Sequence, residues 1–303
     1  MTNRFGDLVG IERPLQQAAM SRIATPELVA AVSNCGALGM VAVSRAPTEQ
    51  VMAQLDAVST LTSRVFGVGF LVPFLDRDCY EAVADRVPLV ELFYGWPDPD
   101  LVLPNVVTGW QVGSVDEARA AVDSGCRFVI AQGVDAGGHV RGTEPLAALL
   151  PAVRVAVDVP VVAAGGIGSR ADADRAFDLG ADAIRVGTRF LAALEANVHP
   201  RYLELLVGAG PDDTVHTEEF CVGWPDAPVR VLASALAAVR GPGPDPVAHL
   251  GDQPIPRFGT TPPNRETTGQ IEAMALYAGR SVGQVTGETL ASDIVEELVG
   301  EPR

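Results

Sequence analysis

Eight short runs of β-branched and other apolar residues recur between residues 14 and 190, and turn residues bound them. Most of the runs are separated by segments with the apolar spacing of helices, and such alternation indicates a parallel sheet. Eight repeats favour closure of the sheet, so we expect an α/β fold, a (β/α)8 TIM barrel. The expected strands are Pro14–Met20, Ala37–Val43, Val65–Val72, Leu89–Tyr94, Asn105–Val112, Phe128–Gly133, Pro160–Gly166 and Ala183–Phe190.

Six helices are expected between these strands. Thr25 can cap the first helix with Pro26 at its first position, and Ser169 with Asp172 makes a capping-box pattern before the last. The link Gly95–Pro104 is too short for a full helix, so either that unit is abbreviated or the fourth strand is misplaced. The expected helices are Pro26–Asn34, Pro47–Leu61, Arg77–Arg86, Val115–Ser124, Pro145–Val157 and Arg170–Leu179.

The chain changes character after the eighth strand. A helix is expected over Leu191–Val207, and the Pro- and Gly-rich residues 210–268 predict an irregular subdomain near the active site, without continuous helix or central strand. From Gly269 onward the apolar spacing is helical again, and these helices are expected to return to the barrel wall. We therefore assign residues 1–209 and 269–303 to the barrel and residues 210–268 to the subdomain.

Composition excludes several functions. None of the 22 basic residues is a lysine, which rules out Schiff-base aldolases, pyridoxal enzymes and P-loop hydrolases. A net charge of −16 disfavours nucleic acid as a partner. No apolar run is long enough to cross a membrane and no signal peptide is evident, so we expect a soluble cytoplasmic protein. The scattered cysteines, without histidines at ligand spacing, predict free thiols and no metal site.

The ends of the last two strands predict a phosphate site. In α/β barrels the active site lies at the carboxyl ends of the strands, and phosphate is commonly held by the loops after the seventh and eighth. Here the seventh strand ends in Ala164, Gly165 and Gly166, and the eighth is followed by Gly187 and Thr188. Adjacent glycines let backbone N–H groups approach an anion closely. The alternative is a pair of tight turns that bind no ligand.

One histidine stands at a strand end. His139 follows the sixth strand on a loop that contains Gly137 and Gly138, where an imidazole can serve as a general base. A structural or merely exposed histidine is the alternative. His216 could also face the site, whereas His199 and His249 are expected at the surface. No Rossmann fingerprint and no nucleophile elbow are present.

These motifs resemble those of the nitronate monooxygenase family, formerly the 2-nitropropane dioxygenases, which are FMN-dependent barrel enzymes. The most specific stretch, Ala131–Gly142, resembles the family signature Q-G-x-E-A-G-G-H, with Asp135 in place of the usual glutamate. Pro160–Phe190 fits the family's glycine loops, and Gln17–Met20 resembles its Q-A-P-M motif. Gly223-Trp224-Pro225, followed by Arg230, is similar to a segment after the barrel.

The resemblance implies the site. His139 matches the family's active-site histidine, and FMN would lie across the barrel mouth. Two departures concern the flavin: Ala19 replaces the family's proline, and Gly69 stands at a position that is commonly asparagine, so no side-chain contact can come from there. The residues implied for the phosphate are Ala164, Gly165, Gly166, Gly187 and Thr188, and those for the ring or ribityl chain are Ala18, Ala19, Met20, Gly69, Gln111, Gln132, Gly137 and Gly138.

The reaction implied is oxidation of small alkyl nitronates by O₂, with a carbonyl compound and nitrite as products. His139 would either hold the anion when protonated or deprotonate a nitroalkane when neutral. The first alternative is a flavin-dependent NAD(P)H:quinone or enoyl-thioester reductase of the same superfamily. A barrel that binds a phosphorylated metabolite without redox chemistry is the remote one. The substrate and the oligomeric state stay open, a homo-oligomer included.

Overall fold

The barrel is present. The computed structural model describes residues 4–300, and all eight expected runs form one parallel sheet in the order β1-β9-β8-β6-β5-β4-β3-β2. A parallel bridge between Gln16 and Leu38 joins the two outer strands, so the sheet is nearly closed and the TIM-barrel prediction is confirmed. The strands are β1 (Leu15–Gln17), β2 (Gly39–Val43), β3 (Phe66–Leu71), β4 (Leu89–Phe93), β5 (Val107–Val112), β6 (Phe128–Gln132), β8 (Val161–Ala164) and β9 (Ala183–Val186).

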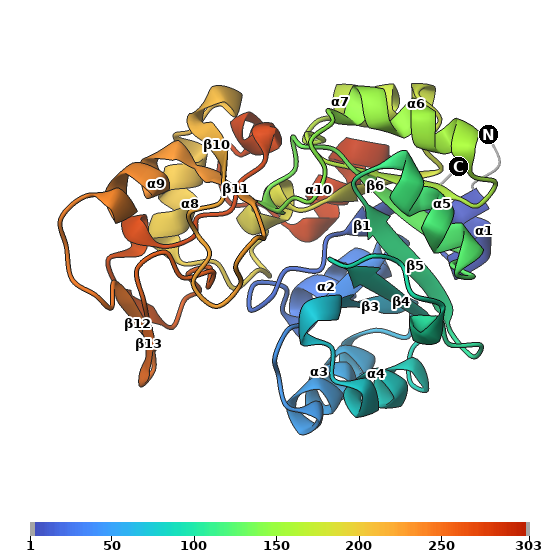
Figure 1. Cartoon of the computed structure of the whole chain (residues 1–303), viewed down its shortest axis with the longest axis horizontal. Helices are drawn as coiled ribbons and strands as arrows, with labels where there is room; N and C mark the ends of the chain where they lie inside the picture. Colours follow the sequence, from blue (N-terminus) through green and yellow to red (C-terminus); the bar gives the residue numbers. More distant parts are fainter. Residues whose placement is uncertain (1–3, 301–303) are drawn as a thin grey trace.

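Helices cover the outside of the sheet (Figure 1). The Thr25 hydroxyl accepts from Leu28 N at 3.1 Å, and Ser169 with Asp172 forms the capping box at the next-to-last unit. Between β4 and β5 only a 3₁₀ turn, Pro99–Leu101, is present, so the fourth unit is abbreviated. The helix α1 (Arg4–Val9) lies at one end of the barrel, and the outer helices are α2 (Pro26–Asn34), α3 (Thr48–Leu61), α4 (Arg77–Ala84), α5 (Val115–Asp123), α6 (Leu146–Ala156) and α7 (Arg170–Asp178).

The barrel interior is filled at its amino-terminal end. Phe5 of α1 packs edge-on against Phe128 of β6, with ring centroids 5.1 Å apart. Leu38, Met40 and Ile130 belong to the same buried cluster. Because this end is packed with side chains, open space is left at the carboxyl ends of the strands.

The expected helix Leu191–Val207 is wrong in its first half. A 3₁₀ turn spans Thr188–Ala192, and the α-helix, α8, begins only at Pro200 and ends at Val207. Between them the backbone bonds to other parts of the chain, since Leu194 N donates to Thr289 O at 2.8 Å and Asn197 N to Ile23 O at 2.9 Å. These tertiary bonds replace the helical ones that the apolar spacing predicts.

The expectation that residues 210–268 are irregular is also wrong in part. Two three-stranded antiparallel sheets form, with orders β10-β11-β7 and β13-β12-β14. Short strands fit between the prolines, and Pro254 lies on edge strand β13, where its missing N–H is tolerated. The elements are β7 (Gly138–His139), β10 (Thr214–Thr217), β11 (Val229–Leu232), α9 (Ala233–Arg240), β12 (Ala248–Leu250), β13 (Gln253–Ile255) and β14 (Thr267–Gly269).

Helical structure in the tail is less extensive than expected. Ile271–Ala273 and Arg280–Gln284 are 3₁₀ turns, and α10 (Ala291–Val299) is the α-helix of this region. α10 packs against α2 and α7, so the tail returns to the barrel (Figure 1). The division of the chain into a barrel and a subdomain stays a prediction. Over residues 4–300 no helix has the length and apolarity needed to cross a bilayer.

Candidate active site

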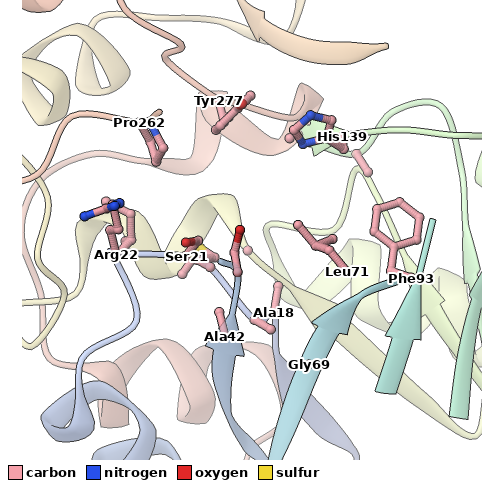
Figure 2. A pocket seen from close by; sticks show the side chains of 18 of the residues that line it. Ala18, Ser21, Arg22, Ala42, Gly69, Leu71, Phe93, His139, Pro262 and Tyr277 are labelled. Atoms are coloured by element: carbon pink, nitrogen blue, oxygen red, sulfur yellow. The ribbon is translucent and has the colours of Figure 1, made fainter. Parts of the chain in front are cut away.

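One cavity of about 600 Å³ opens at the carboxyl ends of the barrel strands. Figure 2 shows its strand-end floor, formed near Ala18, Ala42 and Gly69, and the covering segments that carry His139 and Tyr277. All fourteen site residues expected from the sequence line this cavity. They are Ala18, Ala19, Met20, Gly69, Gln111, Gln132, Gly137, Gly138, His139, Ala164, Gly165, Gly166, Gly187 and Thr188.

Two glycine turns on the cavity wall present backbone N–H groups that lack hydrogen-bond partners in the described chain, and we call these groups the cradle. Gly165 and Gly166 have φ values of +109° and +71°, a conformation that favours glycine. A Cβ on Gly165 would lie 3.0 Å from Gly133 O, so a side chain would also collide with the backbone. The cradle N–H groups make no hydrogen bond within residues 4–300, and this leaves donors ready for an anion. They belong to Gly166, Ile167, Gly187 and Thr188.

Residues Gly279 and Arg280 of the C-terminal segment hold the cradle turn after β9 and the loop of His139 in place by hydrogen bonds. Gly279 N donates to the Thr188 hydroxyl at 3.0 Å, and Arg280 N donates to Asp135 O at 3.0 Å. A Cβ on Gly137 would lie 2.4 Å from Gly279 N, so only glycine permits this approach. The 3₁₀ turn that follows Gly279 therefore sits directly against both the β9 turn and the loop of His139.

His139 is held by strand pairing rather than on a free loop. It forms β7 with Gly138 and pairs with Val229 of β11, so the second sheet fixes the loop after β6. Gln132 Nε2 donates to His139 O at 3.0 Å. His139 Nε2 and Gln132 Oε1 are buried, and neither has a hydrogen-bond partner in the described part of the chain. Both residues line the cavity, and buried polar atoms without a partner indicate a missing polar contact.

Aromatic rings surround the imidazole. The His139 ring centroid lies 3.9 Å from that of Trp224, 5.7 Å from that of Tyr277 and 6.1 Å from that of Tyr94. Burial among these groups lowers the pKa of His139 from 6.5 to about 3, so the imidazole is neutral at pH 7. Among the histidines of residues 4–300, it is the one that lines the cavity.

A buried ion pair forms part of the cavity floor. Arg185 Nη1 of β9 donates to Glu91 Oε2 of β4, and Gln16 Nε2 donates to the same oxygen at 2.9 Å. Glu91 is only 3% exposed. Sequence reasoning missed these three residues, although a charge inside each of two apolar strands was an available signal.

Ala19 and Gly69, the two positions near the expected flavin that depart from the family motifs, lie against one another. A Cβ added to Gly69 would lie 2.7 Å from Ala19 Cβ and 2.7 Å from Glu91 Oε1. A larger residue at 69 would therefore need movement of the β1 turn or of the buried carboxylate. Glycine at 69 and alanine at 19 fit one another in this chain.

Residues 210–268 supply much of the cover, and the sequence identified few of them. Trp224, Gln253 and Thr260 line the cavity, together with Arg22 and Arg45 from the turns after β1 and β2. Figure 2 shows Arg22 and His139 at opposite ends of the cavity.

His216 does not line the cavity. It pairs with Arg230 in the β10-β11 ladder, so the expectation that it could face the site is wrong. Within residues 4–300, no group of three or more His, Cys, Asp or Glu side chains could hold a metal ion. The four cysteines are free thiols.

Comparison with known proteins shows the family. The sequence model described as nitronate monooxygenase matches residues 2–95 and 101–301. The chain belongs to the nitronate monooxygenase family. A probable nitronate monooxygenase of Staphylococcus aureus (strain JH9) is 27% identical, over 86% of this chain and 94% of that protein.

Solved structures agree on the fold of this nitronate monooxygenase family member. FabK from Thermotoga maritima has a TM-score of 0.79 and 27% identity, over 98% of this chain and 95% of the other. The nitroalkane oxidase from Streptomyces ansochromogenes has a TM-score of 0.78 and 27% identity, over 97% and 96% of the two chains. The chain is therefore a flavin-dependent oxidoreductase of the nitronate monooxygenase family.

Proposed function

We propose that the cavity holds one FMN and that the protein oxidises small alkyl nitronates with O₂, releasing a carbonyl compound and nitrite. The observation that carries the proposal is the convergence of an unsatisfied N–H cradle and a neutral, unpartnered imidazole in one cavity of the barrel. Family membership supports the flavin chemistry and disfavours the alternative of a barrel without redox activity.

The residues present fit FMN. A terminal phosphate needs several converging donors, and the free N–H groups of Gly166, Ile167, Gly187 and Thr188 supply them. Gly138, with φ +79° and nothing within 4 Å of where a Cβ would lie, leaves open space on the cavity wall beside His139. Gln132 Oε1 and His139 Nε2 offer polar contacts to a ring or a substrate. By the family resemblance, Ala18, Ala19, Met20, Gly69, Gln111 and Gly137 would complete the contacts to the ring and the ribityl chain.

Bound FMN would supply the oxidation of the substrate and the transfer of electrons to O₂. The chain's part begins with His139. Because its imidazole is neutral at pH 7, it can take the proton from the carbon next to the nitro group of a nitroalkane, and this generates the nitronate. A neutral ring can equally donate one hydrogen bond to a nitronate that is already formed. The low pKa disfavours the other role considered for it, a protonated imidazolium that holds the anion.

Aromatic rings around His139 keep charged side chains away from this proton transfer. Trp224, Tyr94 and Tyr277 cover the imidazole with rings rather than with acidic or basic groups. Burial raises the pKa of Tyr94 to about 12 and that of Tyr277 as well, so both phenols stay neutral. Nε2 itself has almost no solvent contact in the described chain.

The test is nitrite release and O₂ consumption with an alkyl nitronate and no added NAD(P)H. We expect turnover by the wild-type protein. His139→Asn should retain FMN and lower turnover at least about tenfold, because the imidazole that donates a hydrogen bond to the nitronate is lost; with the parent nitroalkane the proton acceptor is lost as well. His199→Asn, which changes a helix-capping histidine outside the cavity, is the control and should keep wild-type turnover.

Two outcomes would contradict the proposal. Full activity of His139→Asn would remove the role of the histidine. Flavin reduction by NADH without any turnover of the nitronate would move the protein to the reductases. An enoyl reductase domain of MlnA from Bacillus amyloliquefaciens shares the fold at 18% identity, so the fold alone does not separate the two activities.

A further inference from the structure

Trp224 stacks on His139. The two ring centroids are 3.9 Å apart and the planes are inclined by 31°, which makes this the shortest of the ring contacts around the imidazole. Trp224 lies between β10 and β11, far from His139 in sequence, and its side chain is 7% exposed. The motif Gly223-Trp224-Pro225 was notable in the sequence, but the proposed reaction gives it no role.

The indole is itself fixed from several directions. Its centroid lies 4.7 Å from that of Tyr94 and 4.9 Å from that of Phe74, both in edge-on geometry. Tyr94 OH donates to Asp226 O at 3.0 Å, and Arg45 bonds to Gly223 O while its guanidinium lies 3.8 Å from the Phe74 centroid. The segment around Trp224 is therefore anchored to the ends of β2 and β4, and the indole has little freedom to turn.

No side-chain hydrogen bond or ion pair of the described chain holds the imidazole in place. Nε2 has no hydrogen-bond partner in the described chain, and no ion pair reaches the ring. The titratable groups that face it are the phenols of Tyr94 and Tyr277, which are neutral at pH 7. The nearby charge of Arg141 lies over the Tyr94 ring, 5.6 Å from its centroid, and is paired with Glu117. Gln132 fixes only the backbone carbonyl of His139.

We propose that Trp224 is a positioning residue, whose indole holds the imidazole of His139 in one orientation and shields it from water. Flat contact between the rings restricts rotation of the imidazole about its side-chain bonds. Removing the indole opens one face of the ring to water, which favours the protonated form. The kinetic part of this inference rests on the proposed function, since it requires His139 to act on the substrate; the titration part does not.

The experiment is an NMR titration of the histidine side chains in ¹⁵N-histidine-labelled, flavin-loaded protein, with His139→Asn to assign the signal. In Trp224→Ala the midpoint for His139 should rise by at least about one pH unit as water reaches the ring. Trp224→Phe keeps an aromatic face and should stay close to the wild type. Trp96→Ala removes a tryptophan that is 59% exposed and does not line the cavity, so it should leave the midpoint unchanged.

Kinetics supply the second readout. In Trp224→Ala, kcat/KM for the parent nitroalkane should fall at least about tenfold because the proton acceptor loses its orientation, with the acid limb of the profile moved to higher pH, and Trp224→Phe should restore most of it. If Trp224→Ala does not fold, Trp224→Leu takes its place. Equal His139 titration midpoints in the wild type and in Trp224→Ala would overturn the inference. It would also be overturned if Trp224→Phe lowered kcat/KM as much as Trp224→Ala does. A wild type without nitronate turnover would contradict the proposed function alone, because the titration still tests the position of the ring.

Discussion

At the scale of single residues, the chemistry depends on how an ordinary histidine is changed by its surroundings. The sequence identified His139 by its place after a strand and directly after two glycines. It could not show the neutrality of the ring, because Trp224, Tyr94 and Tyr277 come from three separate segments with no local signal that they meet. The glycines were more predictable, since Gly165, Gly166 and Gly187 stand where the barrel rule expects phosphate.

Burial of His139 predicts a pH-dependent stability. The folded ring stays neutral down to about pH 3, whereas in the unfolded chain it takes up a proton near pH 6.5. Its contribution is therefore fully present above pH 6.5 and is lost as the pH falls from there toward 3, to the extent of about 2 kcal/mol at about pH 5. The measurement is the free energy of unfolding in urea at about pH 7.5 and at about pH 5. Its decrease between the two pH values should be smaller in His139→Asn than in the wild type by this amount. Equal losses in both proteins would refute this assignment.

At the scale of elements, local patterns predicted the barrel well, and they failed where distant backbone groups compete. The β-branched runs and caps located the strands and the starts of α2 and α7, because each signal is contained within its own element. The first half of the expected helix Leu191–Val207 is not α-helical, since its N–H groups bond to distant carbonyls. β11 was missed because a four-residue strand among prolines has no pattern of its own, yet it is the strand that fixes His139.

The ion pair of Glu91 and Arg185 joins β4 to β9 across the barrel interior. Arg185→Met should destabilise the flavin-loaded protein by about 3–5 kcal/mol, because it leaves a buried carboxylate without its partner. Denaturant unfolding measures this, and adding Glu91→Gln should recover part of the loss. Arg64→Met breaks a pair whose two side chains are about half exposed and should cost no more than about 1 kcal/mol. A similar small cost for Arg185→Met would show that the interior pair is not structurally important.

At the scale of the whole molecule, two parts of the chain contribute different sides of the cavity. The barrel supplies the anion cradle and the polar floor, and residues 210–268 supply Trp224, Gln253 and Thr260 as cover. Figure 1 shows the later elements, α8 to β13, gathered to one side of the barrel strands. The motifs predicted the barrel half of the site, whereas in the cover only Gly223-Trp224-Pro225 had a sequence signal, and its contact with His139 depends on chain packing. Substrate choice is therefore expected to lie mainly in the cover.

The most direct test of the account is an absorbance spectrum of the purified, oxygen-free protein, recorded before and after addition of an alkyl nitronate to one sample and of NADH to another. We predict a yellow protein with close to one FMN per chain, whose flavin spectrum changes on addition of the nitronate and not with NADH alone. A colourless protein, or a flavin that only NADH bleaches, would contradict the account.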